Sequence, residues 1–168
     1  ERSRGLGDVY KRQPMGGDLT RDKITSDKAP TFLVRATKDP DGAALDRIQI
    51  VKGWIDNDGQ PKEKVHNIAW SDDRVINSDG ALPSVGSTIN LAEATYQNSI
   101  GSPELSAFWS DENFDSTKRA FYYVRVLQIP TPRWIVYDAS FFDQEVTKNP
   151  LPIVQERAYS SPIWYSPI

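Results

Sequence analysis

The chain has 168 residues, 38% of them hydrophobic and 11% aromatic, which is enough apolar material for the core of one ordinary domain. Its 20 basic and 23 acidic residues nearly cancel, so neither a nucleic acid nor a membrane is expected as a partner. The sequence contains no cysteine, which excludes disulfides, thiolate nucleophiles and cysteine-ligated metal sites. Composition leaves cytoplasmic and exported locations equally open.

The first thirteen residues differ in character from the rest. They are polar, interrupted by Gly5 and Gly7, and show neither helical nor strand periodicity. Residues 5–13 resemble a translated sequencing-adapter remnant of the kind found at the ends of metagenomic reading frames. We therefore expect residues 1–13 to be a non-native leader and residues 14–168 to form one carboxyl-terminal domain.

The first half of this domain alternates between apolar and polar positions, the period of a strand with one buried face. A loop or short edge strand is predicted over residues 14–30, and strands at residues 31–37, 45–54 and 63–70. The segments Asp-Pro-Asp-Gly at 39–42 and Asp-Asn-Asp-Gly at 56–59 are typical of turns, because Pro presets φ and Gly supplies positive φ. The second turn is expected to close a hairpin.

The second half begins with a polar stretch, residues 71–86, which predicts the longest and most mobile loop. Strand-like runs follow at residues 88–92, 95–100 and 104–109. Residues 120–129 are the clearest strand, and their aromatic and β-branched side chains favour a central strand covered on both faces. A helical turn in residues 138–143 and a short segment at 153–158 are expected before a last strand at 160–165.

This pattern of elements predicts the fold class. No segment sustains a helical period over three turns, and no internal repeat is visible. Several short strands punctuated by turns favour a sandwich over a barrel or an α/β fold. We predict an all-β fold, a β-sandwich with long loops and little helix, for which an immunoglobulin-like arrangement is one option.

Several long motifs carry a resemblance to a known family. They include Ala-Phe-Tyr-Tyr-Val-Arg-Val-Leu at 120–127 and Ile-Pro-Thr-Pro-Arg-Trp at 129–134, together with residues 29–36, 45–54, 155–158 and 161–165. In this order they resemble the bacterial domain-of-unknown-function 3604 family. The resemblance covers essentially residues 14–168.

Members of that family look like metal-dependent hydrolases of the polymerase-and-histidinol-phosphatase type, with a histidine-rich metal site in an amino-terminal domain that is absent from this fragment. The resemblance implies that the chain is an accessory or structural carboxyl-terminal domain of a phosphoesterase-like hydrolase. Its implied partner is that catalytic domain, which would hold the divalent metal. No catalytic residue and no metal ligand is carried over onto this chain.

The residues themselves give little sign of catalysis. His66 is the only histidine, and a catalytic metal needs three or four protein donors, so a structural role is favoured for it. The run at residues 56–59 is similar to part of a calcium loop, but Val65 stands where that loop needs Glu. The acidic pairs at 72–73 and 111–112 are expected to be solvated, and no serine motif predicts a triad.

The five tryptophans allow two interpretations. They could stack on sugars, which would make the chain an independent ligand- or carbohydrate-binding β-sandwich module. Core packing is the favoured interpretation, because most of them lie in or at the end of apolar strands and burying a ring is worth about 1.5–3 kcal/mol.

Trp134 is the exception, because it follows two prolines and stands beside Arg133. Trp and Arg are the residues that most often anchor interfaces. We predict an interface with the catalytic domain; its residues are Arg133, Trp134, Ser161, Pro162, Trp164 and Tyr165. The competing interpretation places Trp134 in the local core and Arg133 in solvent.

Overall fold

The computed structural model describes residues 14–20, 29–147 and 149–167, so the predicted leader at residues 1–13 lies outside the described residues. The strands are β1 (Asp18–Thr20), β2 (Thr31–Thr37), β3 (Leu45–Ile55), β4 (Pro61–Trp70), β5 (Glu104–Ser110), β6 (Ala120–Gln128), β7 (Thr131–Pro132), β8 (Ile153–Val154), β9 (Arg157–Tyr159) and β10 (Ile163–Ser166). The described helix is α1 (Trp134–Phe141).

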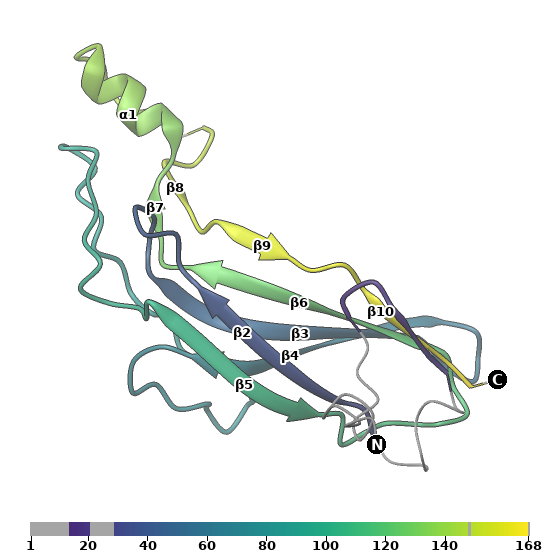
Figure 1. Ribbon diagram of the computed structural model, residues 1–168. Coiled ribbons are helices and arrows are strands. Elements are labelled where there is room, and N and C mark those ends of the chain that lie inside the picture. Colours follow the sequence, from purple (N-terminus) through teal and green to yellow (C-terminus); the bar gives the residue numbers. More distant parts are fainter. Residues whose placement is uncertain (1–13, 21–28, 148, 168) are drawn as a thin grey trace, which may run out of the picture.

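In this part of the chain, the strands β1, β10, β6, β3 and β4 neighbour one another in this order, and β9 also pairs with β6 to complete a six-stranded sheet. The strand pairs are antiparallel except β1 with β10, which is parallel. β2 and β5 form a second, antiparallel sheet that crosses one face of the first (Figure 1). The fold is all-β and sandwich-like, as predicted.

The main core lies between the two sheets, because the strand period of two turns every second side chain inward. Ile48 and Ile50 of β3 share one buried cluster with Val34 of β2 and Leu105 of β5. Tyr122 of β6 belongs to the same cluster and is almost fully buried. Alternation in the sequence therefore identified the inner faces of β2 and β3, whereas β6, predicted to be covered on both faces, packs against the second sheet on one face only.

The predicted hairpin is confirmed, because β3 and β4 pair from Arg47 and Trp70 down to Ile55 and Pro61. The Asp56 carboxylate accepts hydrogen bonds from two backbone N–H groups within the turn, at 3.0 and 2.8 Å. Gly59 supplies the positive φ of 75° that the reversal requires. The Asp-Asn-Asp-Gly run is thus a turn that Asp56 closes with its own side chain.

Residues 88–92 and 95–100 do not form the predicted strands. Within this described segment, Asn90 and Thr95 form an isolated bridge. The Asn90 side-chain oxygen accepts hydrogen bonds from the backbone N–H groups of Ala92 and Glu93, at 3.1 and 3.3 Å. Such local bonds offer the backbone an alternative to a sheet ladder, and here they turn the chain back on itself.

The helix α1 begins four residues before the helical turn predicted at 138–143. Its first residues, Trp-Ile-Val-Tyr, have the composition of a strand. Ile135 and Val136 nevertheless pack with Ala94 in a small buried cluster, and this tertiary contact outweighs the local preference. α1 is eight residues long, and no helix in the described ranges is long and apolar enough to cross a membrane.

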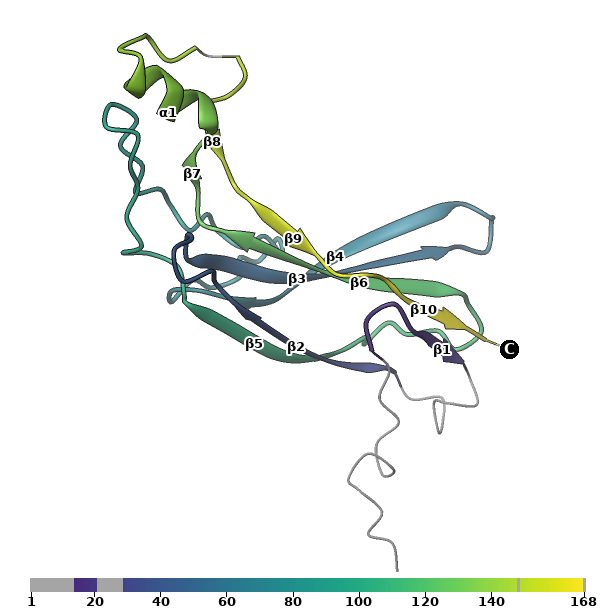
Figure 2. The same cartoon turned by 45° about the horizontal axis from the view of Figure 1, so that its top comes forward.

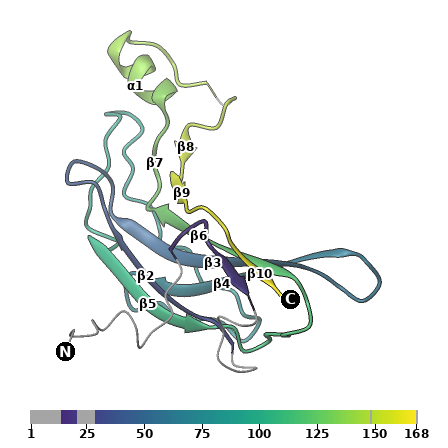
Figure 3. The ribbon, with the colours of Figure 1, turned by 45° about the vertical axis from the view of Figure 1, so that its right-hand side comes forward.

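One end of the molecule extends beyond the sandwich. Its parts are α1, the short pair β7–β8, the chain that joins them, and an arm formed by residues 88–97. In Figures 1, 2 and 3 these parts lie together on one side, away from β10 and from the tip of the β3–β4 hairpin. We refer to them as the projecting end.

Candidate functional site

The projecting end exposes large apolar side chains that the sandwich does not cover. Trp134 is 64% exposed and Phe141 is 82% exposed, at the two ends of α1. The exposed set comprises Trp134, Tyr137, Phe141, Phe142, Leu151 and Ile153. Exposed apolar residues that gather in one region mark an interaction surface more often than scattered ones do.

A surface hollow of about 480 Å³ lies where α1 meets the arm. Its lining residues are Glu93, Ala94, Tyr137, Asp138, Ser140 and Phe141. This lining includes two carboxylates and two aromatic rings but no basic side chain. Apolar and acidic groups therefore lie side by side on the surface of the projecting end.

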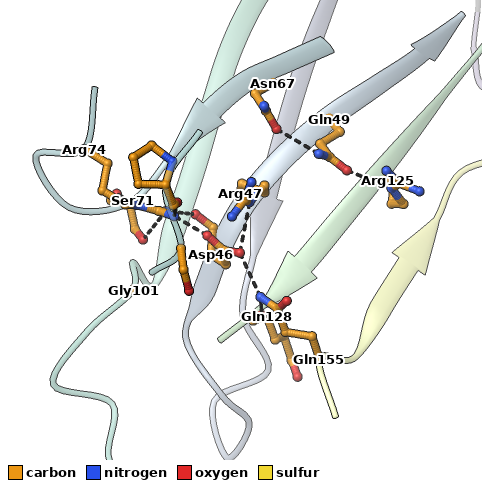
Figure 4. Close-up of polar contacts among 12 residues, drawn as sticks. Asp46, Arg47, Gln49, Asn67, Ser71, Arg74, Gly101, Arg125, Gln128 and Gln155 are labelled. Atoms are coloured by element: carbon orange, nitrogen blue, oxygen red, sulfur yellow. Dashed lines mark hydrogen bonds and ion pairs between the residues drawn. The ribbon is translucent and has the colours of Figure 1, made fainter. Parts of the chain in front are cut away.

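A buried carboxylate, Asp46 of β3, fixes the base of the projecting end. Its Oδ2 accepts hydrogen bonds from Arg47 Nε at 3.0 Å and from Gln155 Nε2 at 2.8 Å, and Arg74 Nη2 lies 2.7 Å from Oδ1 (Figure 4). Gln155 also donates to the carbonyl of Gln128. Because Arg74 and Gln155 come from distant segments, Asp46 joins the sheet to the loop at residues 71–86 and to the chain that leads out of β8.

Arg74 organises the long loop that the sequence predicted over residues 71–86. Its guanidinium donates to the carbonyl oxygens of Ser71, Pro83 and Asp46, at 3.0, 3.0 and 2.9 Å. Asp72 extends this arrangement, because its carboxylate accepts a hydrogen bond from the Gly101 N–H at 3.1 Å. The loop is therefore wrapped around one arginine that the buried Asp46 holds in place.

A second buried ion pair lies between the sheets. Lys52 Nζ lies 2.5 Å from Asp111 Oδ2, and the Tyr122 hydroxyl donates to the same oxygen at 2.7 Å. Burial, aided by Asp111, raises the pKa of Tyr122, so its phenol stays a donor. Asp111 is almost fully buried, which corrects its predicted place on a solvated surface. The strand ladder brings Lys52 and Tyr122 opposite each other.

His66 lies on the same inner side as this ion pair. Its ring packs on Trp109 with 4.8 Å between centroids, and burial lowers its pKa. Across residues 14–20, 29–147 and 149–167 there is no group of three or more His, Cys, Asp or Glu side chains that could hold a metal. The described residues therefore do not fit the divalent metal that the resemblance assigns to another domain.

The structure divides the predicted interface residues into two groups. Arg133 and Trp134 lie at the start of α1, whereas Ser161, Pro162 and Trp164 lie in or before β10, toward the other end of the molecule (Figures 1 and 2). The two groups therefore do not form one continuous patch.

Tyr165, the sixth predicted interface residue, corrects the prediction in another way. It follows the exposed Trp164 in β10, so strand alternation turns it into the core, where it is almost fully buried. Its hydroxyl donates to the Ser116 carbonyl at 2.8 Å.

Sequence reasoning also missed a group of aromatic rings on the outer face of the six-stranded sheet. Phe121 and Tyr123 of β6 are nearly parallel, with ring centroids 6.4 Å apart. Trp164 contacts Phe121 at 5.2 Å, and Tyr159 contacts Tyr123 at 6.2 Å. The i, i+2 spacing of the first two rings was visible in the sequence, but the other two come from β10 and β9, which only the fold brings alongside.

Together, the layers and surfaces define an all-β, sandwich-like domain with an apolar projecting end. The sequence profile of the family described as "Protein of unknown function (DUF3604)" matches residues 6–167, so the chain belongs to this family. The match includes residues 6–13, part of the segment predicted to be a leader. No curated protein and no solved structure matches the chain significantly.

Proposed function

We propose that this chain is an accessory domain of a metal-dependent hydrolase and that its projecting end docks onto the catalytic domain. The observation that carries the docking is the exposure of Trp134, Phe141 and their apolar neighbours at one end of the molecule. The hydrolase half of the proposal rests on the resemblance of the family to metal-dependent phosphoesterases. The catalytic metal would then be held by the partner domain.

The energetics of burial favour docking through these side chains. Fully burying one large apolar side chain contributes about 1.5–3 kcal/mol relative to leaving it in water. Trp134 and Phe141 stand at opposite ends of α1, so a single partner surface can cover both. Tryptophan and arginine dominate interface hot spots, and Arg133 immediately precedes Trp134.

The polar contacts at the base of the projecting end support the same function. Asp46 connects this region to the sheet, because its buried carboxylate accepts a hydrogen bond from Gln155, the residue that directly follows β8. A surface that is already held in place loses less conformational freedom when it binds. The projecting end is therefore arranged as a preformed docking surface.

Calorimetric titration of the 168-residue chain with the separately produced catalytic domain of its parent tests the proposal. The double substitution Trp134→Ser and Phe141→Ser should weaken association at least about 100-fold, because it removes two hot-spot side chains. Phe108→Ser is the matched control, since Phe108 is 77% exposed on the other sheet and should leave affinity unchanged. Absence of association with the wild-type chain, or equal losses in both variants, would refute the docking.

The alternative function, an independent ligand- or carbohydrate-binding module, draws support from a different part of the molecule. The rings of Phe121, Tyr123, Tyr159 and Trp164 gather on the outer face of the six-stranded sheet, away from the projecting end. This aromatic face is therefore separate from the docking surface at the projecting end.

A further inference from the structure

The outer face of the six-stranded sheet, which is turned away from β2 and β5, carries two adjoining rows of side chains. The ring row comprises Phe121, Tyr123, Tyr159 and Trp164. The amide row comprises Asn67, Gln49 and Arg125, which face one another across β4, β3 and β6 (Figure 4). Residues paired directly across a ladder point to the same face, and Tyr159 pairs with Arg125, so the two rows meet.

The ring of Phe121 lies close to the sheet because a glycine lies beneath it. Gly53 of β3 stands opposite Phe121, and a Cβ added to it would lie 2.2 Å from the Phe121 ring. The ring therefore rests directly on the backbone of β3. The row ends in side chains that remain open to solvent, since Trp164 is 50% exposed and Tyr159 is 58% exposed. If the ring row served only to cover the sheet, it would not need the exposed rings of Trp164 and Tyr159.

The amide row is held in a fixed orientation. Gln49 Nε2 donates to Asn67 Oδ1 at 2.8 Å, and Arg125 Nε donates to Gln49 Oε1 at 2.8 Å (Figure 4). The two terminal nitrogens of Arg125 have no hydrogen-bond partner among the described residues, so they remain available as donors. Glu63, which pairs with Gly53 on the same face, adds a carboxylate, and Arg157, which pairs with Leu127, adds a second cation.

We propose that this face binds a neutral, extended oligosaccharide of β-1,4-linked pyranoses. A pyranose whose hydroxyls are equatorial presents flat C–H faces that pack on aromatic rings, while its hydroxyls donate to and accept from amide groups and accept from guanidinium groups. A β-1,4-linked chain forms a straight ribbon. The strand segment from Phe121 to Arg125 rises about 13 Å, long enough for more than one sugar unit.

Three features of the face favour this ligand over others. Two cations, Arg125 and Arg157, and one carboxylate, Glu63, give the face charges of both signs, which suits a neutral ligand better than a basic peptide. Its rings follow one another in a continuous row, which suits an extended ribbon better than a coiled, α-linked chain. The mixture of rings and fixed polar groups distinguishes it from the projecting end, where the six exposed apolar side chains have no comparable amide row.

Calorimetry on the 168-residue chain with cellohexaose tests the proposal. We expect saturable binding that Trp164→Ala and Tyr159→Ala each weaken about tenfold or more, because each removes a stacking surface. Trp164→Phe, which keeps a ring, should retain most of the affinity. Phe108→Ala on the opposite sheet is the control and should bind as the wild type does.

Three outcomes would overturn it: no binding of cellohexaose, binding that survives loss of both outer rings, or equal affinity for the α-linked maltohexaose. If Trp164→Ala does not fold, Tyr159→Ala decides, since that ring stands on a different strand. A Trp164 variant that loses affinity for the catalytic domain but keeps cellohexaose binding would also overturn the proposal, and would identify this face as part of the domain interface.

Discussion

Between the two sheets, Ile48, Ile50 and Tyr122 are almost fully buried, whereas at the projecting end Trp134 and Phe141 lie largely in solvent. The body of the sandwich buries the apolar residues of its inner faces, although Phe108, Tyr159 and Trp164 remain exposed on its outer faces. The projecting end has only a small cluster around Val136 beneath its helix. The difference is consistent with our proposal that the body supplies stability and the projecting end supplies surface for a partner.

Buried polar groups show where the two regions are joined. Asp46 lies at the junction, because Gln155, directly after β8, donates to its carboxylate, and Arg74 pairs with the same carboxylate from the loop at residues 71–86. The Lys52–Asp111 pair lies instead inside the body. Removing the Asp46 contacts should therefore change the junction between the two regions and also lower the free energy of unfolding.

The largest expected effect comes from Asp46→Ala. Removing this carboxylate leaves Arg74 and Arg47 buried without their anionic partner, and breaking a buried ion pair in this way costs about 3–5 kcal/mol. Denaturant melts of the wild type and of Asp46→Ala would measure the loss in the free energy of unfolding. Arg35→Ala is the control, because its pair with Glu104 is exposed and such pairs contribute at most about 1 kcal/mol. Equal losses in the two variants would contradict the assigned role of Asp46.

Gly53→Ala should have a smaller effect confined to the body. The added Cβ would overlap the Phe121 ring, which must move off the β3 backbone, and overpacking of this kind costs about 1–3 kcal/mol. Chemical denaturation gives the cost, and near-ultraviolet circular dichroism reports the displaced ring. Gly53 does not have a positive φ, so the cost comes from the overlap with the ring and not from backbone strain. An undiminished stability and an unchanged aromatic spectrum for Gly53→Ala would rule out the close packing of Phe121 on β3.

The sequence predicted the body of the sandwich better than the projecting end, for physical reasons. Strands such as β3 and β6 carry their own alternation, and the β3–β4 turn carries its own Asp and Gly. The arm at residues 88–97 also alternates, but side-chain hydrogen bonds of Asn90 divert it. The local sequence pattern is enough to predict β3, β6 and the turn after β3. The conformation of the arm depends instead on side-chain hydrogen bonds that compete with strand pairing.

The candidate sites were harder to predict because distant residues compose them. Asp46 looked like an ordinary strand residue, and its partners Arg74 and Gln155 lie far along the chain. Trp164 gains its aromatic neighbours only when β10 pairs with β6. The exposure of Trp134 was anticipated, because the prolines before it limit strand pairing.

His66 should give the body a pH dependence that the projecting end lacks. Burial, followed by the charge of Lys64, lowers the pKa of His66 below its ordinary value of 6.5, so the unfolded chain binds a proton more readily than the folded chain. Lys52 acts in the same direction, whereas Asp111 and Glu112 oppose it.

The sign follows from this linkage. The contribution of His66 is fully present above the unfolded pKa and declines as the pH falls below it. Stability measured between about pH 7.5 and pH 5.5 should therefore fall less steeply in His66→Gln than in the wild type. The effects of the carboxylates that both proteins share cancel in the comparison. Parallel curves of stability against pH would show that His66 is not buried as a neutral ring.

Trp134→Ala should have the smallest effect on the isolated chain, within about 0.5 kcal/mol, because a side chain that is 64% exposed loses little packing when it is truncated. Its neighbour Ile135 provides the matched contrast on the same helix. Ile135 is buried against Ala94, so Ile135→Ala should cost about 2–5 kcal/mol. Denaturant melts of both variants compare the outer and inner sides of α1 directly. A loss of several kcal/mol for Trp134→Ala would place its ring in the local core, and the projecting end would then lose its strongest candidate for an interface anchor.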